Sequence, residues 1–212
     1  MQSFRQSFKD QMPLYVFVAV LFLVGVLFGA LMVNALSLEQ QQDLAGYLDH
    51  FFLTLHEGGE GEIPASFGSI AALHLKWLGL IWILGLSVIG LPGILILDFF
   101  KGVLIGFTVG YLVGQYSWKG LLFALVSVAP QNLLVIPVLM MCSVAAITFS
   151  LYIIKNRLLM QRSGSVTKPF ASYIGLTCVM ALLILGISSF ETWITPSMMQ
   201  WVAPMLLPAS SL

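Results

Sequence analysis

The side chains able to do chemistry in this sequence fall into three groups. The first is a polar stretch that holds His50, His56, Glu57, Glu60 and Glu62. Imidazole nitrogens and carboxylate oxygens bind metal ions, but these residues match no standard metal-ligand spacing. We therefore predict solvated side chains and no bound metal in this stretch. His74, further along, is predicted to be a packing or interfacial residue.

Two further groups lie inside apolar sequence. Asp98 and Lys101 are three residues apart, so they are able to pair on one helix face. Charges at membrane depth mark functional sites, but this pair neutralises itself near the predicted cytoplasmic boundary, which favours a structural role. An ion or proton role and a partner contact stay open. Gln131 and Asn132 follow Pro130. Their amides either cap backbone groups that the proline frees or form a polar site at a broken helix.

No catalytic motif accompanies these groups. The sequence contains no GxSxG, no HExxH, no phosphate-binding loop and no paired intramembrane aspartates. Its two cysteines, Cys142 and Cys178, stand in apolar runs, where a thiol ordinarily serves packing. The sequence therefore predicts a protein that is not an enzyme and has no cofactor.

The amino-acid composition indicates whether water or lipid surrounds these groups. Of the 212 residues, 59% are hydrophobic and 8% are charged, whereas a soluble domain has roughly 25% charged residues. So much apolar surface cannot be hidden from water, so we predict an all-α integral membrane protein. The formal net charge is zero, which gives no overall field to attract nucleic acid.

Five apolar runs are long enough to cross a bilayer, which takes about 20 helical residues. They cover residues 14–36, 67–90, 94–115, 121–154 and 172–190. The first run is too long for the apolar core of a signal peptide, so we interpret it as an uncleaved anchor. Residues 91–93 read as a turn or a sharp kink between the second and third spans. Alternatively, the second span ends at Leu97 and residues 98–101 are the connection.

The fourth run is too long for a simple span. Residues 116–120 form a short polar break before it, and Pro130 and Pro137 interrupt it. We predict a broken or kinked fourth helix, or a short re-entrant piece before the span proper. The tail at residues 191–212 is apolar but irregular.

Residues 37–66 form the one long polar segment, with six acidic residues and no lysine or arginine. Within it, Leu44, Leu48, Phe51 and Phe52 recur at helical spacing. This pattern predicts an amphipathic helix on the membrane surface that ends near Gly58. We interpret the four apolar residues as surface-contact residues.

The distribution of basic residues predicts the orientation. Six of the nine lie in residues 1–13 and in the loop at 155–171: Arg5, Lys9, Lys155, Arg157, Arg162 and Lys168. Five crossings place these two segments on one side, and the positive-inside rule makes that side cytoplasmic. Residues 37–66 and the tail are then extracytoplasmic.

A glycine stripe gives the clearest packing signal. Its members are four residues apart on one helix face: Gly102, Gly106, Gly110 and Gly114. Without Cβ atoms, two helices approach closely and gain dispersion contacts. The partner is either another span of the same chain or a helix of a second molecule, in a homo-oligomer or a complex. Gly25 and Gly29 form a weaker example on the first span.

Four blocks of the sequence, in this order, resemble the stage II sporulation protein M family of endospore-forming bacteria. They read LYVFVAVLFLVGVLFGALMVNALSL at 14–38, WILGLSVIGLPGILI at 82–96, FFKGVLIGFTVGYLVGQ at 99–115 and SVAPQNLLVIP at 127–137. Distant membrane relatives have a Pro-His-Gly…Glu pattern at the Pro130 position, where this chain has Pro-Gln-Asn. That departure argues against transferring polar-site chemistry from those relatives.

The resemblance implies a non-catalytic membrane component of engulfment, in which the mother-cell membrane migrates around the forespore. It implies stage II sporulation proteins D and P, which cut peptidoglycan, as partners at the sporulation septum. A second hypothesis is a small transporter or channel subunit with a polar path along Asp98, Lys101, Gln131 and Asn132. A third, a membrane hydrolase, has no supporting residue set.

Overall fold

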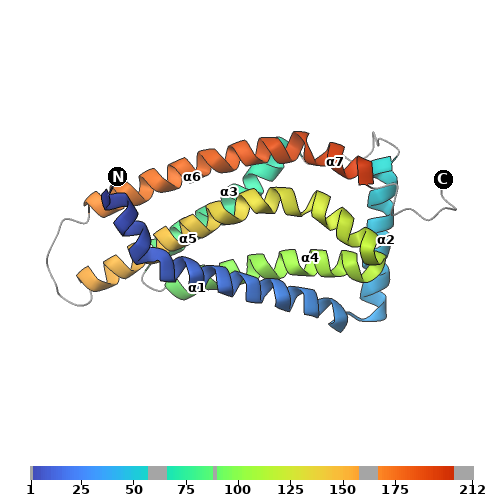
Figure 1. The fold of residues 1–212 in the computed structure, drawn as a ribbon, viewed down its shortest axis with the longest axis horizontal. Helices are drawn as coiled ribbons and strands as arrows, with labels where there is room; N and C mark the ends of the chain where they lie inside the picture. Colours follow the sequence, from blue (N-terminus) through green and yellow to red (C-terminus); the bar gives the residue numbers. More distant parts are fainter. Residues whose placement is uncertain (1, 57–65, 88–89, 158–166, 203–212) are drawn as a thin grey trace.

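The computed structural model describes residues 2–56, 66–87, 90–157 and 167–202, and all of its regular secondary structure is helical (Figure 1). The elements are α1 (Gln2–Met32), the 3-10 turn η1 (Val33–Ala35), α2 (Leu38–His56), α3 (Phe67–Gly85), α4 (Gly90–Ser127), α5 (Ala129–Arg157), α6 (Thr167–Trp193) and α7 (Thr195–Val202). Five stretches are long and apolar enough to cross a membrane: Gln11–Ala35, Phe67–Gly85, Gly90–Ser127, Ala129–Lys155 and Thr167–Met199. The prediction of an all-α membrane protein with five spans is confirmed.

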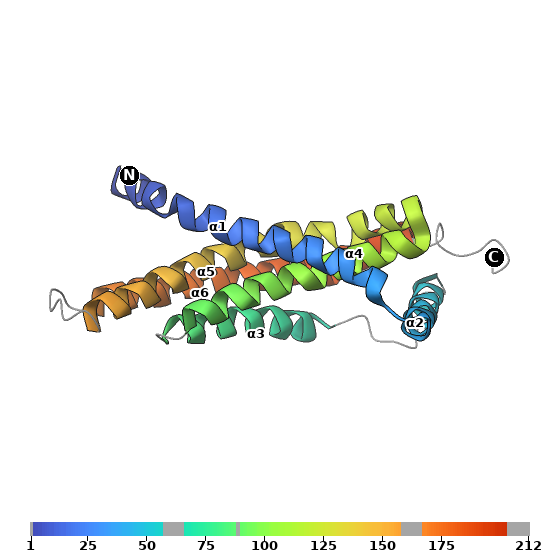
Figure 2. The same cartoon turned by 90° about the horizontal axis from the view of Figure 1, so that it is seen from below.

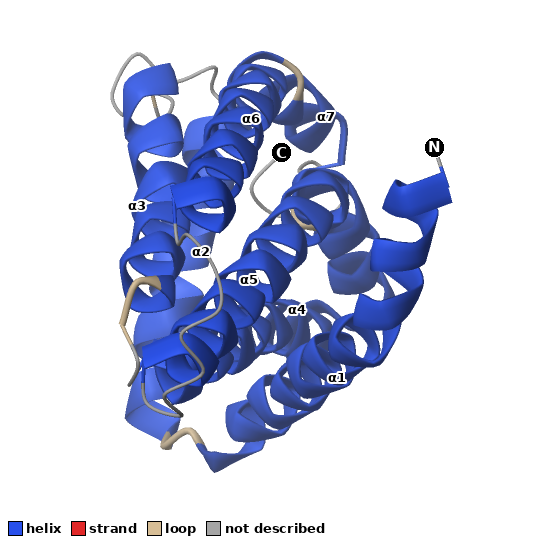
Figure 3. Ribbon diagram, turned by 90° about the vertical axis from the view of Figure 1, so that its left-hand side faces the viewer, coloured by secondary structure: helices blue, strands red, loops and turns tan. Residues whose placement is uncertain are grey.

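The five long helices run along the long axis of the molecule, and α5 lies in the middle of them (Figures 1 and 3). In its most apolar 18-residue stretch, 56% of α5 is buried, against 22% or less in the other four spans. The short helix α2 lies across one end of the bundle (Figure 2). The other four spans therefore expose most of their apolar surface to lipid, as membrane helices do.

The core contains at least one fully buried branched side chain from every span. These side chains are Val18 of α1, Ile81 of α3, Ile94 of α4, Val135, Val144 and Ile147 of α5, and Ile184 of α6. Branched side chains have few rotamers, so they fill a fixed volume between helices at little entropic cost. Dispersion contacts at this core hold the bundle together in lipid, where burial gains no hydrophobic free energy.

Side-chain caps fix where two helices begin. At the start of α2, the Ser37 hydroxyl accepts from the Gln40 backbone N–H at 3.3 Å, and the Gln40 side chain accepts from the Ser37 N–H at 3.0 Å. This reciprocal pair is a capping box. At the start of α3, the Ser66 hydroxyl accepts from the Ser69 N–H at 3.4 Å.

The second and third spans meet earlier in the chain than the sequence predicts. Helix α3 ends at Gly85 rather than at residue 90, and α4 begins at Gly90. Pro92 therefore lies in the first turn of α4, where a missing N–H costs no helical hydrogen bond. The prediction of a turn at 91–93 is wrong. The alternative connection at 98–101 is also wrong, because those residues are helical.

The chain reverses at Ser117, inside the polar break that the sequence indicates. Ser117 has φ 50° and ψ −126°. Residues 118–127 then run back beside the end of the preceding helix (Figure 1), and Gly120 packs on the Leu112 carbonyl. A side chain at Gly120 would overlap that carbonyl oxygen. The polar break is thus a sharp helix–helix corner.

Replacing Ser117 with glycine is expected to stabilise the protein by about 1 kcal/mol, because glycine adopts positive φ without the steric cost of a Cβ. The thermal midpoint in detergent should rise by about 2–4 °C. Ser172→Gly, at an exposed site in regular helix α6, should lower it instead. Equal shifts for the two variants would show that the conformation at Ser117 carries no strain.

The fourth run is broken, as the sequence predicts. Its first piece ends at Ser127 and α5 begins at Ala129, so the break falls at Val128, two residues before Pro130. The Asn132 side chain donates to the Val128 carbonyl at 2.8 Å. Pro137 lies within α5 without ending it. In the tail, residues 195–202 form α7, where the sequence predicts irregular structure.

Candidate functional site

The glycine stripe of α4 packs against α1 of the same chain. A Cβ at Gly102 would overlap the Phe22 carbonyl oxygen, and one at Gly106 would overlap the Val26 carbonyl oxygen. Gly110 lies against Ala30. Gly25 and Gly29 of α1 complete the seam against Phe99 and Val103. This seam leaves no room for a helix of another molecule at these positions.

Gly114 is the exception in the stripe. Its nearest neighbour, Val33 Cγ1, would lie 4.0 Å from an added Cβ. A contact at that distance is ordinary van der Waals packing. Of the four predicted helix-contact residues, three are therefore committed to α1, and Gly114 lies where the two helices diverge.

An ionisable cluster lies within the bundle, between α3, α4 and α6. His74 Nε2 is 2.8 Å from Glu191 Oε2, and the two side chains are only 6% and 16% exposed. Nδ1 of His74 is buried and has no hydrogen-bond partner among the described residues. The Glu191 carboxylate also acts electrostatically on Lys101, whose Nζ lies 5.5 Å from the centre of the Trp77 ring.

Asp98 forms a separate polar contact on the α5 side of α4. Its Oδ1 accepts a hydrogen bond from Ser143 Oγ at 2.8 Å, and its Oδ2 is buried without a partner among the described residues. The expected pairing of Asp98 with Lys101 is wrong, because no ion pair joins their charged atoms within 4.0 Å. The two side chains point to different neighbours, α5 for Asp98 and α3 with α6 for Lys101.

These polar groups lie deeper than the sequence suggests. Lys101 is eleven residues into α4, which at 1.5 Å per residue is about 16 Å from the start of the helix. Its neighbour Gly102 packs against Phe22, midway along the span Gln11–Ala35. Lys101 therefore lies near mid-membrane and not at the cytoplasmic boundary. Ionisable groups at such depth are costly, and they pair with one another or mark a site.

Gln131 and Asn132 do not join this cluster. Asn132 lines an apolar cavity with Ile105 and Val109, and Gln131 lines a cavity of about 270 Å³ beneath α2. Neither cavity is lined by Asp98 or Lys101. The predicted polar path is therefore split into two groups, one near mid-membrane and one toward the end of the bundle that carries α2.

We call that end, formed by α2, α7 and the corner at Ser117, the platform end. Two hydrogen bonds attach α2 to α4: Tyr111 Oη donates to the Gln41 carbonyl at 3.0 Å, and Tyr116 Oη donates to Asp49 Oδ1 at 3.1 Å. Leu48 and Phe51 pack against a small buried cluster of Leu112, Phe123 and Ala124. The apolar face of α2 is thus partly covered by its own bundle.

The other two predicted contact residues of α2 are Leu44 and Phe52. Leu44 is half-buried and lines the cavity beneath the helix. Phe52 belongs to α2, but its side chain is outside the described part of the structure. The acidic residues Glu39, Asp43 and Asp49 are all exposed. Of these, Asp49 bonds Tyr116 of α4.

Three large aromatic side chains are exposed at the platform end. They are Tyr47 on α2, Trp118 after the corner and Trp201 on α7. Tryptophan and tyrosine concentrate at membrane–water interfaces, where the ring is in the headgroup layer. This group therefore marks one membrane boundary and places α2 at the surface.

The described residues form no cluster suited to a metal ion. Among the described residues, no group of three or more histidine, cysteine, aspartate or glutamate side chains is arranged to hold an ion. The predicted polar cluster from His56 to Glu62 has its side chains outside those residues.

A sequence model described as stage II sporulation protein M matches residues 18–196 of the chain, which is most of its length. The chain belongs to the stage II sporulation protein M family. No curated protein and no solved structure gives a match. Membership of the stage II sporulation protein M family implies a role in sporulation, and it agrees with the five membrane-spanning helices described above.

Sequence reasoning missed one functional candidate in this stage II sporulation protein M member. Glu191 is 117 residues from its partner His74, and the sequence assigns it only to the start of an irregular tail. One signal was available: it is one of just two acidic residues between residue 63 and the end of the chain, and the other is Asp98. A lone carboxylate in apolar sequence requires a partner, because burying an unpaired charge is costly.

Proposed function

We propose that this protein is a non-catalytic membrane scaffold that recruits and localises extracytoplasmic peptidoglycan hydrolases during forespore engulfment. The family points to stage II sporulation proteins D and P as the partners and to the sporulation septum and mother-cell membrane as the location. The whole chain then forms one membrane domain, in which the bundle holds its surface helix toward the partners.

The platform end carries this proposal. Helix α2 is bonded to α4 through its Gln41 carbonyl and its Asp49 carboxylate, so its position is fixed relative to the spans. Its exposed face presents Glu39 and Asp43 away from the bundle. A rigid, charged helix at a membrane surface suits a docking role, because charge complementarity steers and orients a soluble partner.

The proposed orientation follows from charge at the two ends. At the opposite end from the platform, which we call the basic end, lie the start of α1, the end of α5 and the start of α6 (Figure 1). The sequence there carries Arg5, Lys9, Lys155, Arg157 and Lys168. By the positive-inside rule, the basic end is cytoplasmic and the platform end is extracytoplasmic.

Reversing the charge of Glu39 and Asp43 together to lysine is expected to reduce co-purification of the two hydrolase partners at least tenfold. The thermal midpoint of unfolding of this variant should stay unchanged, because both residues are exposed and surface substitutions alter stability by about 0.5 kcal/mol or less. Lys168→Glu, an exposed charge reversal at the basic end, is the matched control. Full partner recovery with the α2 variant would contradict docking on this face.

The buried carboxyl group of Asp98 favours a second candidate, a small transporter or channel subunit. Such a function would use Asp98, whose Oδ2 has no partner among the described residues, as an ion or proton site. Reconstituted protein should then show flux that disappears in Asp98→Asn. Purified protein that binds the hydrolases and shows no flux would support the scaffold instead.

A further inference from the structure

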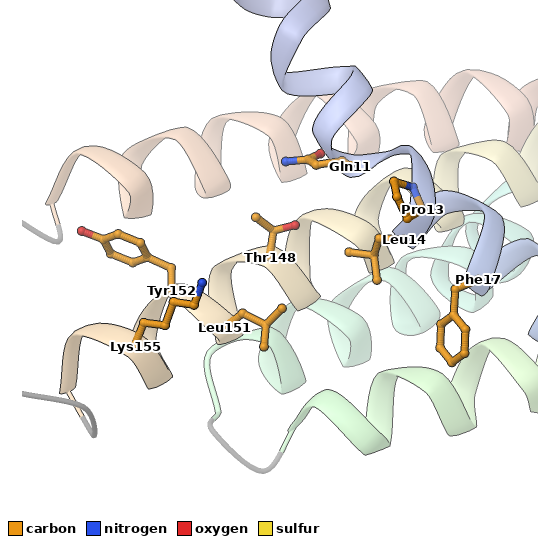
Figure 4. Close-up of a pocket in the computed structure, with 8 residues that line it drawn as sticks. All are labelled: Gln11, Pro13, Leu14, Phe17, Thr148, Leu151, Tyr152 and Lys155. Atoms are coloured by element: carbon orange, nitrogen blue, oxygen red, sulfur yellow. The ribbon is translucent and has the colours of Figure 1, made fainter. Parts of the chain in front are cut away.

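A groove opens at the basic end between α1 and α5 (Figure 4). It has a volume of about 610 Å³, within the range of small-molecule binding sites. Its lining is Gln11, Pro13, Leu14, Phe17, Thr148, Leu151, Tyr152 and Lys155. A second cavity of about 280 Å³ shares Gln11, Thr148 and Tyr152 with it and extends toward α6. Together they form one recess on the inner side of the α1 kink.

Pro13 accounts for the groove. A proline inside a helix has no N–H for the carbonyl four residues earlier and clashes with that turn, so the helix bends. Helix α1 contains Pro13, and its first turns point away from the rest of the bundle (Figure 2). Beyond the bend, the glycine seam draws α1 tightly onto α4. The groove is the space left where α1 leaves the bundle.

The lining of the groove changes from apolar to polar along its length. Phe17 and Leu14 lie toward the middle of the membrane, while Gln11 lies about 9 Å from Phe17 along the helix, toward the basic end. On the facing helix, Tyr152 and Lys155 continue this polar part (Figure 4). An occupant must therefore be apolar at its deep end and polar at its outer end.

The polar part of the groove is positively charged. Lys155 is exposed, and among the described residues no acidic side chain lies within 4.0 Å of its nitrogen. Arg157 follows it on α5, and Arg5 and Lys9 precede the groove on α1. Asp10 is the single acidic residue in these segments. An anion at the outer end of the groove would offset this charge.

We propose that the groove binds an anionic phospholipid, with an acyl chain against Leu14, Phe17 and Leu151 and the headgroup phosphate at Lys155. The phospholipid matches both the apolar-to-polar order of the lining and its positive end. A free phosphate ion would leave the apolar part unfilled. A partner helix would need several small residues for close approach, and Thr148 is the single one in the lining. This inference does not depend on the scaffold function.

The role of Lys155 is tested on protein purified in neutral detergent, by using native mass spectrometry to count the lipid molecules bound. Cardiolipin is the titrated ligand, and phosphatidylcholine and inorganic phosphate are the comparison ligands. Lys155→Gln is expected to weaken cardiolipin binding about fivefold, the effect of one basic residue near an anionic headgroup. Lys168→Gln, which removes an exposed charge outside the groove lining, should leave it unchanged. Equal losses in the two variants, or none in Lys155→Gln, would overturn the proposal.

The apolar part of the groove is tested by a substitution that fills it with a larger side chain and leaves the charge unchanged. Leu151→Trp should reduce the cardiolipin adduct at least fivefold, whereas Leu183→Trp on the lipid-facing side of α6 should not; the two leucines are 41% and 49% exposed. Unchanged binding in Leu151→Trp would overturn the proposal, since the acyl chain would then lie elsewhere. Saturation of the site by phosphate alone, or a co-purified helix in place of lipid, would also overturn it.

Discussion

Replacing Gly106 with leucine is expected to separate α1 from α4 and to destabilise the folded protein by about 3 kcal/mol or more. The glycine lies directly against the Val26 backbone, so even a methyl group would overlap the carbonyl oxygen. Backbone cannot yield as a flexible side chain does, and overpacking costs of this kind typically reach the upper part of the 1–3 kcal/mol range or exceed it. The seam would open along its length, because Gly102 and Gly110 depend on the same approach of the two helices.

The buried thiol of Cys142 provides the measurement. Cys142 is buried and Cys178 is exposed, so a thiol-reactive dye in a Cys178→Ser background labels the protein only when the bundle opens. Gly106→Leu should lower the midpoint of labelling on heating by about 6–12 °C. Gly114→Leu is the control on the same helix, since its neighbour is 4.0 Å away, and it should change the midpoint little. Equal effects at the two sites would show that α1 and α4 are not closely packed at Gly106.

Replacing Glu191 with leucine is expected to destabilise the protein by about 3 kcal/mol, because it removes the partner of a buried histidine. His74 is 6% exposed and bonds Glu191 at 2.8 Å, while its Nδ1 has no partner among the described residues. The variant would leave the whole ring without a hydrogen bond in an apolar interior. It would also remove the carboxylate that acts on Lys101.

A double-mutant cycle separates the interaction energy between His74 and Glu191 from the energy lost with the packing of each side chain. His74→Leu combined with Glu191→Leu should be less destabilised than the sum of the single variants by 1 kcal/mol or more, as expected for groups in direct contact. Glu39→Leu, at an exposed acidic site on α2, should change the free energy of unfolding by about 0.5 kcal/mol or less. Strict additivity would mean that the two side chains do not interact in the folded protein.

The rigidity that these two contacts give the bundle bears on the choice between a scaffold and a transporter. The glycine seam joins α1 to α4, and the His74–Glu191 pair joins α3 to α6. Both contacts hold a span rigidly against its neighbour. A scaffold needs this rigidity to hold α2 at a fixed height above the membrane. A transporter would instead need Asp98 to become accessible to water, which makes the response of flux to Asp98→Asn the discriminating result.

The sequence alone predicted the membrane environment, the all-α class, the five crossings and an amphipathic helix within residues 37–66, which the structure has at Leu38–His56. These depend on local properties: the number of consecutive apolar residues, the helical spacing of Leu44, Leu48 and Phe51, and proline and polar breaks. It also marked residues 116–120 as a break and Pro130 as an interruption. The family followed from the order of four sequence blocks and is confirmed by the match over residues 18–196.

The faces along which the helices meet were not predictable from the sequence. In lipid, the outer surface of a span is as apolar as its core, so periodicity does not reveal the buried side. The glycine stripe indicated a close contact but not that α1 occupies it. Asp98 bonds Ser143 instead of its near neighbour Lys101, and His74 finds Glu191 across 117 residues of sequence. Such pairings depend on the arrangement of whole helices, because spacing along one helix fixes only which side chains share a face.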